Sequence, residues 1–433
     1  MNQENKEVLL KVEHLEQYFK LGKRTLKAVD DVNFEIYKGE VLGLVGESGC
    51  GKTTTGRSII RLYDITGGSV YLEGKRICAG IRPYKQAVKD AKNEYKTNLA
   101  ALNKEKKEKE ANGTFSAEEL ASYEEKKKAL DEKLLEVVKT NSELIKSAKY
   151  DHKNCNKEFA KFEMQKVTDE YAPKLEAETD PVKHQELENE YKEKLRLASK
   201  DRIMNKMQMI FQDPISSLDP RMTVHDIIAE GLVIRGIKDK EFIDKEVYRV
   251  LELVGLVPEH ASRYPHEFSG GQRQRIGIAR AVVLNPELII ADEPVSALDV
   301  SIQAQVINLL NELRDKMGLT TLFIAHDLSV VKYFSDRIAV MYFGKIVELT
   351  TSDELFKHPL HPYTKSLLSA IPLPDPHYEK TRKRIIYNPL AEHDYSQEGP
   401  TMREVIPGHF VYCNTAEFEK YQAEIKKIDS ETK

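Results

Sequence analysis

The segment Gly46 to Thr53 has the sequence Gly-Glu-Ser-Gly-Cys-Gly-Lys-Thr and fits the pattern G-x-x-x-x-G-K-[S/T] of a phosphate-binding loop. Glycines at these positions let the backbone wrap a phosphate chain with its N–H groups pointing inward. A helix that begins at the loop adds further N–H donors and a favourable dipole for an anion. We expect Lys52 to reach the β and γ phosphates of a nucleotide and the Thr53 hydroxyl to bind Mg²⁺. The nucleotide-binding residues predicted in this segment are Gly46, Glu47, Ser48, Gly49, Cys50, Gly51, Lys52, Thr53 and Thr54.

Two adjacent carboxylates follow an apolar run later in the chain. The run Leu288 to Ala291 has the character of a buried strand and ends in Asp292 and Glu293. Such a strand would hold Asp292 near the Mg²⁺ of the phosphate loop, and Glu293 would polarise a water that attacks the γ-phosphate. An apolar strand that ends in Asp-Glu is common. Together with the phosphate loop it predicts a nucleotide-hydrolysing site.

These residues require elements that bring them to one edge of a sheet. Apolar runs of strand length alternate with helical stretches after the phosphate loop, which indicates a parallel α/β sheet with its ligand at the C-terminal ends of the strands. The expected strands are 40–45, 207–211, 287–291 and 320–325, and the expected helices are 54–62, 224–235, 240–253, 273–284 and 301–317.

The first 80 residues predict short strands and one aromatic of interest. Phe19, beside Tyr18, is expected in a polar loop, where it would stack on a purine ring or cap the small sheet. Its position relative to the other motifs favours stacking. The expected strands are 8–13, 26–29, 32–37 and 41–45, followed by a hairpin over 69–77 that turns at Glu73-Gly74.

The composition changes abruptly between Ile81 and Met204, where Lys and Glu dominate and Gly113 is the single glycine. We expect helices over 84–110, over 117–171 after a capping box at Ser116 to Glu119, and after Asp180. Their apolar residues fall close to a heptad spacing, which favours an antiparallel helical hairpin projecting from the core without disturbing the nucleotide site. A solvated, partly disordered charged linker is the alternative.

Composition bounds the function classes. The chain has 433 residues and a net charge of -4, which argues weakly against nucleic acid as the main partner. It contains no apolar stretch approaching the ~20 residues of a membrane span and no cleavable signal. We therefore expect a cytoplasmic protein, held at a membrane only through a partner. Four scattered cysteines are expected to be reduced thiols.

The run Phe268-Ser-Gly-Gly-Gln-Arg-Gln274 resembles the signature motif of the ATP-binding subunits of ABC transporters, with Phe268 in place of the more usual leucine. The order of the motifs is also similar to that family. Gln212 matches the Q-loop, Ser296 to Asp299 the D-loop and His326 the switch histidine. The resemblance covers residues 8–349 apart from the insertion.

The resemblance implies that two such domains close head to tail around two ATP molecules. Each ATP would lie between one subunit's phosphate loop and the other's signature helix, where Ser269, Gly270 and Gly271 contact the γ-phosphate. Gln212 would contact Mg²⁺ and the attacking water, while His326 would hold the γ-phosphate; the plainer alternative for His326 is a core histidine that ends a strand. The resemblance thus adds Phe19, Gln212, Ser269, Gly270, Gly271, Gln272, Asp299 and His326 to the nucleotide-binding residues. The expected catalytic residues are Lys52, Gln212, Glu293 and His326, and the expected Mg²⁺ ligands are Thr53, Gln212 and Asp292.

The C-terminal part narrows the resemblance. Residues 358–372 and 211–220 are similar to segments of the oligopeptide/dipeptide importer ATPases, and Pro407 to Val411 resembles tails of the F-type subunit of oligopeptide permeases. Beyond Thr350 we expect an irregular appended segment. Some members of the group carry a cysteine cluster there, but this tail has only Cys413, so no iron–sulfur centre is expected.

The predicted fold class is an α/β ABC-type nucleotide-binding domain with a parallel RecA-like sheet, an antiparallel β subdomain and an α-helical subdomain. Its expected divisions are 1–80 and 205–349 for the domain itself, 81–204 for the helical insertion and 350–433 for the extension. The resemblance implies an ATP- and Mg²⁺-dependent importer motor on the cytoplasmic face of the membrane. Its partners would be two permease subunits, a second ATPase subunit and, indirectly, an external solute-binding protein. The alternatives are a soluble ABC-type ATPase with a helical arm, of the DNA-maintenance or translation-factor class, or an importer ATPase for nickel or another small solute.

Overall fold

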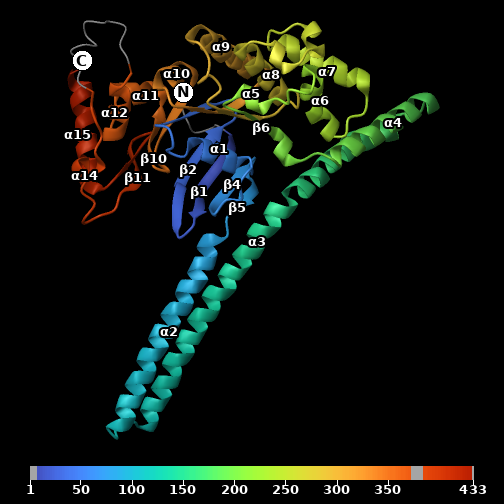
Figure 1. Ribbon diagram of the computed structural model, residues 1–433. Helices are drawn as coiled ribbons and strands as arrows, with labels where there is room; N and C mark the ends of the chain where they lie inside the picture. Colours follow the sequence, from blue (N-terminus) through green and yellow to red (C-terminus); the bar gives the residue numbers. More distant parts are fainter. Residues whose placement is uncertain (1–6, 372–383, 432–433) are drawn as a thin grey trace.

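Two sheets and a long helical arm make up the computed structural model, which describes residues 7–371 and 384–431 (Figure 1). Pro372, the last residue of the His- and Pro-rich motif, lies outside the described residues. Of the helices in the described ranges, none combines the length and apolar character that a membrane span requires.

The smaller sheet is antiparallel and has the strand order β2-β1-β4-β5. It contains two long strands where the sequence predicts three short ones, because His14 and Asp31 adopt φ values of 48° and 62° at irregularities that let each strand continue past its polar residues. The expected hairpin turns at Glu73 and Gly74. The strands are β1 (Val8–Leu21), β2 (Arg24–Tyr37), β4 (Gly67–Leu72) and β5 (Lys75–Ala79).

The larger sheet has the order β11-β12-β10-β9-β3-β8-β7-β6. Its strands from β9 to β6 are mutually parallel, as predicted, so the C-terminal ends of β3, β7 and β8 meet at one edge. The helix α1 (Lys52–Ile59) packs close to this sheet: a side chain at Gly56 would meet Ile290 and Ile324. The parallel strands are β3 (Val41–Val45), β6 (Met207–Ile210), β7 (Leu288–Asp292), β8 (Thr320–Ala325) and β9 (Arg337–Tyr342).

A helical subdomain lies between β6 and β8 in the sequence (Figure 1). Thr223 and Asp239 cap two of its helices by accepting hydrogen bonds from the N–H groups of Asp226 and Phe242. The apolar faces of these helices join the large core cluster beside the parallel sheet. The helices of this stretch are α5 (Pro214–Ser217), α6 (Val224–Ile234), α7 (Lys240–Leu253), α8 (Gly270–Val282) and α9 (Val300–Met317), and α10 (Leu328–Phe334) follows β8.

The insertion forms three helices rather than a charged linker: α2 (Arg82–Ala111), α3 (Ala117–Ala177) and α4 (Pro181–Ala198). The predicted capping box is present, because the Ser116 side chain accepts from the Glu119 N–H and the Glu119 carboxylate accepts from the Ser116 N–H. The 61 residues of α3 correspond to ~90 Å of helix. Figure 1 shows α2 lying along the N-terminal half of α3, away from the body, and α4 at the other end of α3.

The middle of α3 is part of the core, contrary to the expectation of a purely projecting arm. Cys155 and Phe159 are buried in the cluster beneath the antiparallel sheet. Arg76 of β5 donates a hydrogen bond to Asp151 at 2.7 Å, and the ammonium of Lys75 lies 4.0 Å from the centre of the Phe162 ring. A heptad pattern predicts contacts between the helices of the arm. It does not predict that another surface of α3 packs against the antiparallel sheet, so the sequence analysis missed this contact.

The prediction of an irregular tail is wrong. The strand β12 pairs with β10, so two tail strands extend the main sheet at the edge opposite β6. A third core cluster, which includes Val405, Val411 and Tyr421, packs α15 against these strands. The elements are β10 (Lys345–Thr351), α11 (Ser352–Lys357), α12 (Pro362–Ser369), α14 (Pro389–Glu392), β11 (Thr401–Ile406), β12 (His409–Cys413) and α15 (Thr415–Glu431).

Candidate functional site

The phosphate loop connects β3 to α1 and needs its glycines for space as well as for conformation. Gly51 has a φ of 111° and caps the N-terminus of α1. A Cβ at Gly46 would collide with the main-chain oxygen of Met341, and one at Gly51 with that of Ala28. The loop therefore packs closely between β9 and β2, and the main chains of both strands restrict its conformation.

Lys52 points back into the loop. Its Nζ donates hydrogen bonds to the carbonyl oxygens of Gly46 at 2.7 Å and Glu47 at 2.9 Å, and the side chain is almost fully buried. The same Nζ lies 4.0 Å from a carboxylate oxygen of Glu293. The ammonium is thus held inside the loop that the sequence predicts to surround phosphate, next to the carboxylate predicted to activate water.

Thr53 and Asp292 meet at the end of β7. The Thr53 hydroxyl donates to Oδ1 of Asp292 at 2.7 Å, and the aspartate is fully buried. Burial raises the pKa of Asp292, partly offset by the Thr53 hydrogen bond and the Arg57 charge. Its Oδ2 has no hydrogen-bond partner among the described residues. The same oxygen lies 3.9 Å from the Arg57 guanidinium. A hydroxyl beside a buried carboxylate oxygen that accepts no hydrogen bond is a ligand set that suits a hard cation such as Mg²⁺.

Glu293 contacts the other predicted catalytic residues. Its Oε2 accepts a hydrogen bond from Nε2 of Gln212 at 3.0 Å and lies 3.1 Å from Nδ1 of His326. These side chains follow three neighbouring strands, β6, β7 and β8. Glu293 adopts a φ of 45°, a conformation that is costly for a residue with a side chain and is common at functional sites. The strand ends thus place one carboxylate between an amide and an imidazole.

The signature residues lie at the start of α8, which begins at Gly270 and not at Arg273 as predicted. The Ser269 hydroxyl accepts from the Gln272 N–H, and the Gln272 side chain accepts from the Ser269 N–H, forming a capping box. Asp299 caps α9. Within the described part of the chain, no hydrogen bond or ion pair joins these residues to the phosphate loop. The structure therefore does not bring this second set of predicted nucleotide contacts to the first within one chain.

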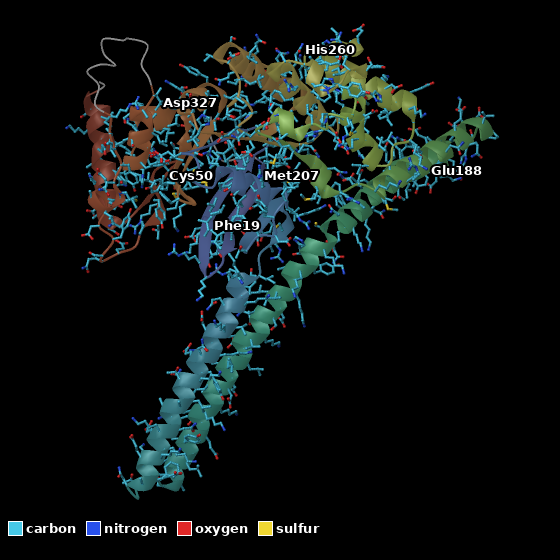
Figure 2. All side chains as sticks on the ribbon, viewed as in Figure 1. Phe19, Cys50, Glu188, Met207, His260 and Asp327 are labelled. Carbon is cyan, nitrogen blue, oxygen red and sulfur yellow. The ribbon has the colours of Figure 1, made fainter. Side chains whose placement is uncertain are left out.

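Phe19 is in strand β1, where it pairs with Leu26, and not in a loop as predicted. Its ring makes an edge-on contact with Tyr63 at 5.5 Å between centroids. Its neighbour Tyr18 donates a hydrogen bond to Asp30. Figure 2 shows Phe19 on the antiparallel sheet and Glu188 far out on α4. Stacking of Phe19 on a purine stays a prediction.

Sequence reasoning missed a tail residue at the phosphate loop. The hydroxyl of Tyr363, in α12, accepts a hydrogen bond from the N–H of Glu47 at 2.9 Å. Tyr363 lies within the His- and Pro-rich motif that marked the family resemblance. The spacing of that motif carries no indication of a partner 316 residues away.

Comparisons with known proteins give a consistent result. The family model "ABC transporter" matches residues 29–157 and 176–296, and "Oligopeptide/dipeptide transporter, C-terminal region" matches residues 347–399. An oligopeptide transport ATP-binding protein, OppF, of Bacillus subtilis is 47% identical over 416 residues, 96% of this chain and 99% of the relative. OppF of Streptococcus mutans is 41% identical over 97% of this chain and 99% of its own length.

Two further matches complete the comparison. A dipeptide transport ATP-binding protein, DppF, of Lactococcus lactis is 41% identical over 96% of each chain. Among solved structures, a dimeric ATP-binding cassette bound to ADP and Pi matches with a TM-score of 0.47 at 20% identity, over 79% of this chain and 99% of that one. From the family models and the full-length relatives, the chain belongs to the oligopeptide/dipeptide group of ABC transporter ATP-binding proteins and is an ATPase with the ABC fold.

Proposed function

We propose that this protein is the motor subunit of an importer for oligopeptides or dipeptides, and that it works on the cytoplasmic face of the membrane. The observation that supports the chemistry best is the cluster around Glu293, where Gln212, His326 and Lys52 surround one carboxylate. Peptides as the solute follow from the names of the relatives and from the C-terminal region that this chain shares with its family.

The position of each residue indicates its role in ATP hydrolysis. Lys52 and the loop N–H groups bind the phosphates, while Thr53 and Asp292, with Gln212, hold the metal. A Mg²⁺ ion held there would supply positive charge against the phosphates of the nucleotide. Glu293 accepts a proton from the attacking water, and Gln212 and His326 keep its carboxylate in place.

A second ATPase subunit would complete the site. The Ser269 to Gln272 corner begins a 13-residue helix, so the first N–H groups of α8 point out of the helix end as anion donors. Because no hydrogen bond or ion pair joins these residues to their own phosphate loop in the described chain, we propose that they serve the nucleotide of the partner ATPase. Asp299, at the N-cap position of the neighbouring helix α9, would lie at the same interface.

Permease subunits would dock on the helical subdomain. A hollow of about 710 Å³ lies between α6 and α7. It is lined by apolar residues such as Met222 and Ile237 and by charged residues such as Asp226 and Lys240. Val233 and Ile234, which also line it, are 56% and 72% exposed, so they form an apolar surface open to a partner. The chain runs from Gln212 through α5 directly into α6, so a partner in this hollow would be linked to the Glu293 cluster.

Fractionation and uptake test this function together. The tagged protein should leave the cell membrane only with its permeases, and cells carrying Lys52→Ala should lose uptake of a labelled tripeptide because nucleotide binding fails. A protein that purifies with DNA or ribosomes would support the soluble ABC-type alternatives. Normal peptide uptake with lost nickel uptake in the Lys52→Ala cells would instead identify the solute as a metal ion.

A further inference from the structure

Tyr363 connects the tail of the protein to its phosphate loop. It is the second residue of α12, its side chain is 1% exposed, and its hydroxyl accepts the hydrogen bond from the Glu47 N–H. Glu47 is the second residue of the phosphate loop. The bond therefore reaches the loop at the end where the strand β3 gives way to the glycine-rich turn.

The peptide between Gly46 and Glu47 is held from both sides. Its N–H donates to Tyr363, and its carbonyl oxygen accepts the hydrogen bond from Lys52 Nζ at 2.7 Å. A peptide unit is a rigid plane, so a rotation that moves its N–H also moves its carbonyl. The Tyr363 hydroxyl and the Lys52 ammonium are thus coupled through one plane of the loop backbone.

Tyr363 is itself fixed by buried groups of the tail and the core. Its ring centre lies 4.4 Å from that of Tyr342 at the end of β9. The fully buried carboxylate of Glu348, in β10, accepts the N–H groups of Leu360 at 2.9 Å and His361 at 3.0 Å, which anchors the start of α12. Burial raises the pKa of the Tyr363 phenol, so its oxygen stays neutral and protonated at physiological pH. The hydroxyl is therefore presented to the loop from a rigid support.

We propose that Tyr363 is a positioning residue for the phosphate loop, which holds the Gly46–Glu47 peptide in the orientation that aligns Lys52 for phosphate binding. The inference rests on the ATPase function proposed above and deepens it by giving the C-terminal region a part in nucleotide affinity. Tyr363 touches the loop backbone and acts on the nucleotide only through that peptide and Lys52.

The variant Tyr363→Phe removes the hydroxyl and keeps the ring. Tyr387→Phe is the matched control, because Tyr387 belongs to the same aromatic cluster and its hydroxyl contacts Nε2 of His393 at 2.9 Å instead of the loop. In the assembled transporter, Tyr363→Phe should raise KM for Mg-ATP by roughly five- to tenfold, the loss of about one hydrogen bond. Its kcat should stay within about twofold, because the contacts of Glu293 with Gln212 and His326, which act on the water, do not involve Tyr363.

A second measurement tests the positioning role without the assembled transporter. The rise in melting temperature that saturating Mg-ATP gives the full-length chain should be smaller for Tyr363→Phe than for Tyr387→Phe. Equal KM values and equal ATP-induced stabilisation for the two variants would overturn the positioning role. A wild-type transporter that hydrolyses no ATP would instead overturn the proposed function, so the two failures are distinguishable.

Discussion

The nucleotide site and the helical arm are built on different physical principles. In the site, Asp292, Glu293 and Lys52 are buried or nearly so, and each contacts residues distant in sequence. Along the outer part of α2, charged pairs such as Lys104 with Glu108 are local, exposed contacts between neighbouring turns. Such pairs contribute a few tenths of a kcal/mol each. The geometry of the site therefore depends on contacts between distant segments, whereas the distal arm is stabilised by contacts within its own helices.

The arm also differs along its own length. Its root, around Cys155 and Phe159, shares the core of the antiparallel sheet. At its tip near Gly113, the ion pair between Lys109 and Glu119 joins the facing turns of α2 and α3. Substitutions in the site should therefore strongly reduce ATP hydrolysis, and substitutions at the root should strongly reduce stability. Substitutions at the tip should have small effects on both. The predictions below test this gradient.

The largest effect is expected for Glu293→Gln. The amide keeps the shape of the side chain but cannot accept a proton from water, so ATP hydrolysis should fall by about 10²- to 10³-fold while ATP binding persists. Hydrolysis is measured in the assembled transporter and binding with a fluorescent ATP analogue. Glu312→Gln, an exposed carboxylate on α9, is the control and should behave like the wild type. A Glu293→Gln variant with wild-type turnover would remove Glu293 as the base.

The next effect concerns stability at the root of the arm. Phe159→Ala should lower the free energy of unfolding by about 3–5 kcal/mol, because it empties a buried volume under the antiparallel sheet. Leu135→Ala, on the same helix but 68% exposed, should change that free energy by less than about 0.5 kcal/mol. Urea unfolding of the two full-length variants measures the difference. Similar midpoints would mean that α3 is not part of the core.

Much of this architecture was predictable from the sequence, because its signals are local. The phosphate loop, the strands that end in Asp292 and His326, and the capping box at Ser116 depend on short segments with fixed residue types. Contacts between distant segments were not predictable: the burial of Phe159 under β5 and the bond from Tyr363 to Glu47 depend on how whole elements are placed. The tail strand β12 was missed for a related reason, since short strands with His and Cys have no clear alternation until a partner strand is known.

A smaller effect is expected at Cys50, the thiol inside the phosphate loop. Burial raises the pKa of Cys50, so little thiolate exists at neutral pH and alkylation should be slow. The labelling rate should rise about tenfold per pH unit from pH 7 to 9, because the thiolate fraction grows in that proportion below the pKa. Saturating Mg-ATP should slow labelling by at least about tenfold, as read by mass spectrometry with Cys50→Ser as the control. Equal rates with and without nucleotide would contradict its placement in the binding loop.

The smallest effect on chemistry is expected at the tip of the arm. Tyr95 donates to Asp131 at 2.6 Å, which marks where α2 and α3 face each other. Replacing 99–129 by a short Gly/Ser turn removes the tip beyond this point and leaves the root intact. ATP hydrolysis by the assembled transporter should stay within about twofold of the wild type. Removing all of 81–204 should instead destabilise the protein, because Phe159 and Cys155 leave the core with it.

The variant with the shortened arm also distinguishes an effect on ATP hydrolysis from an effect on transport. The tip contains no group that the nucleotide site uses, so any loss it causes should appear in transport and not in hydrolysis. Lost uptake of a labelled tripeptide with unchanged ATP hydrolysis would indicate that the tip contacts a partner of the transporter. A folded, shortened protein that no longer binds ATP would show the reverse: the arm would then belong to the catalytic unit, and the contrast between site and tip would be wrong.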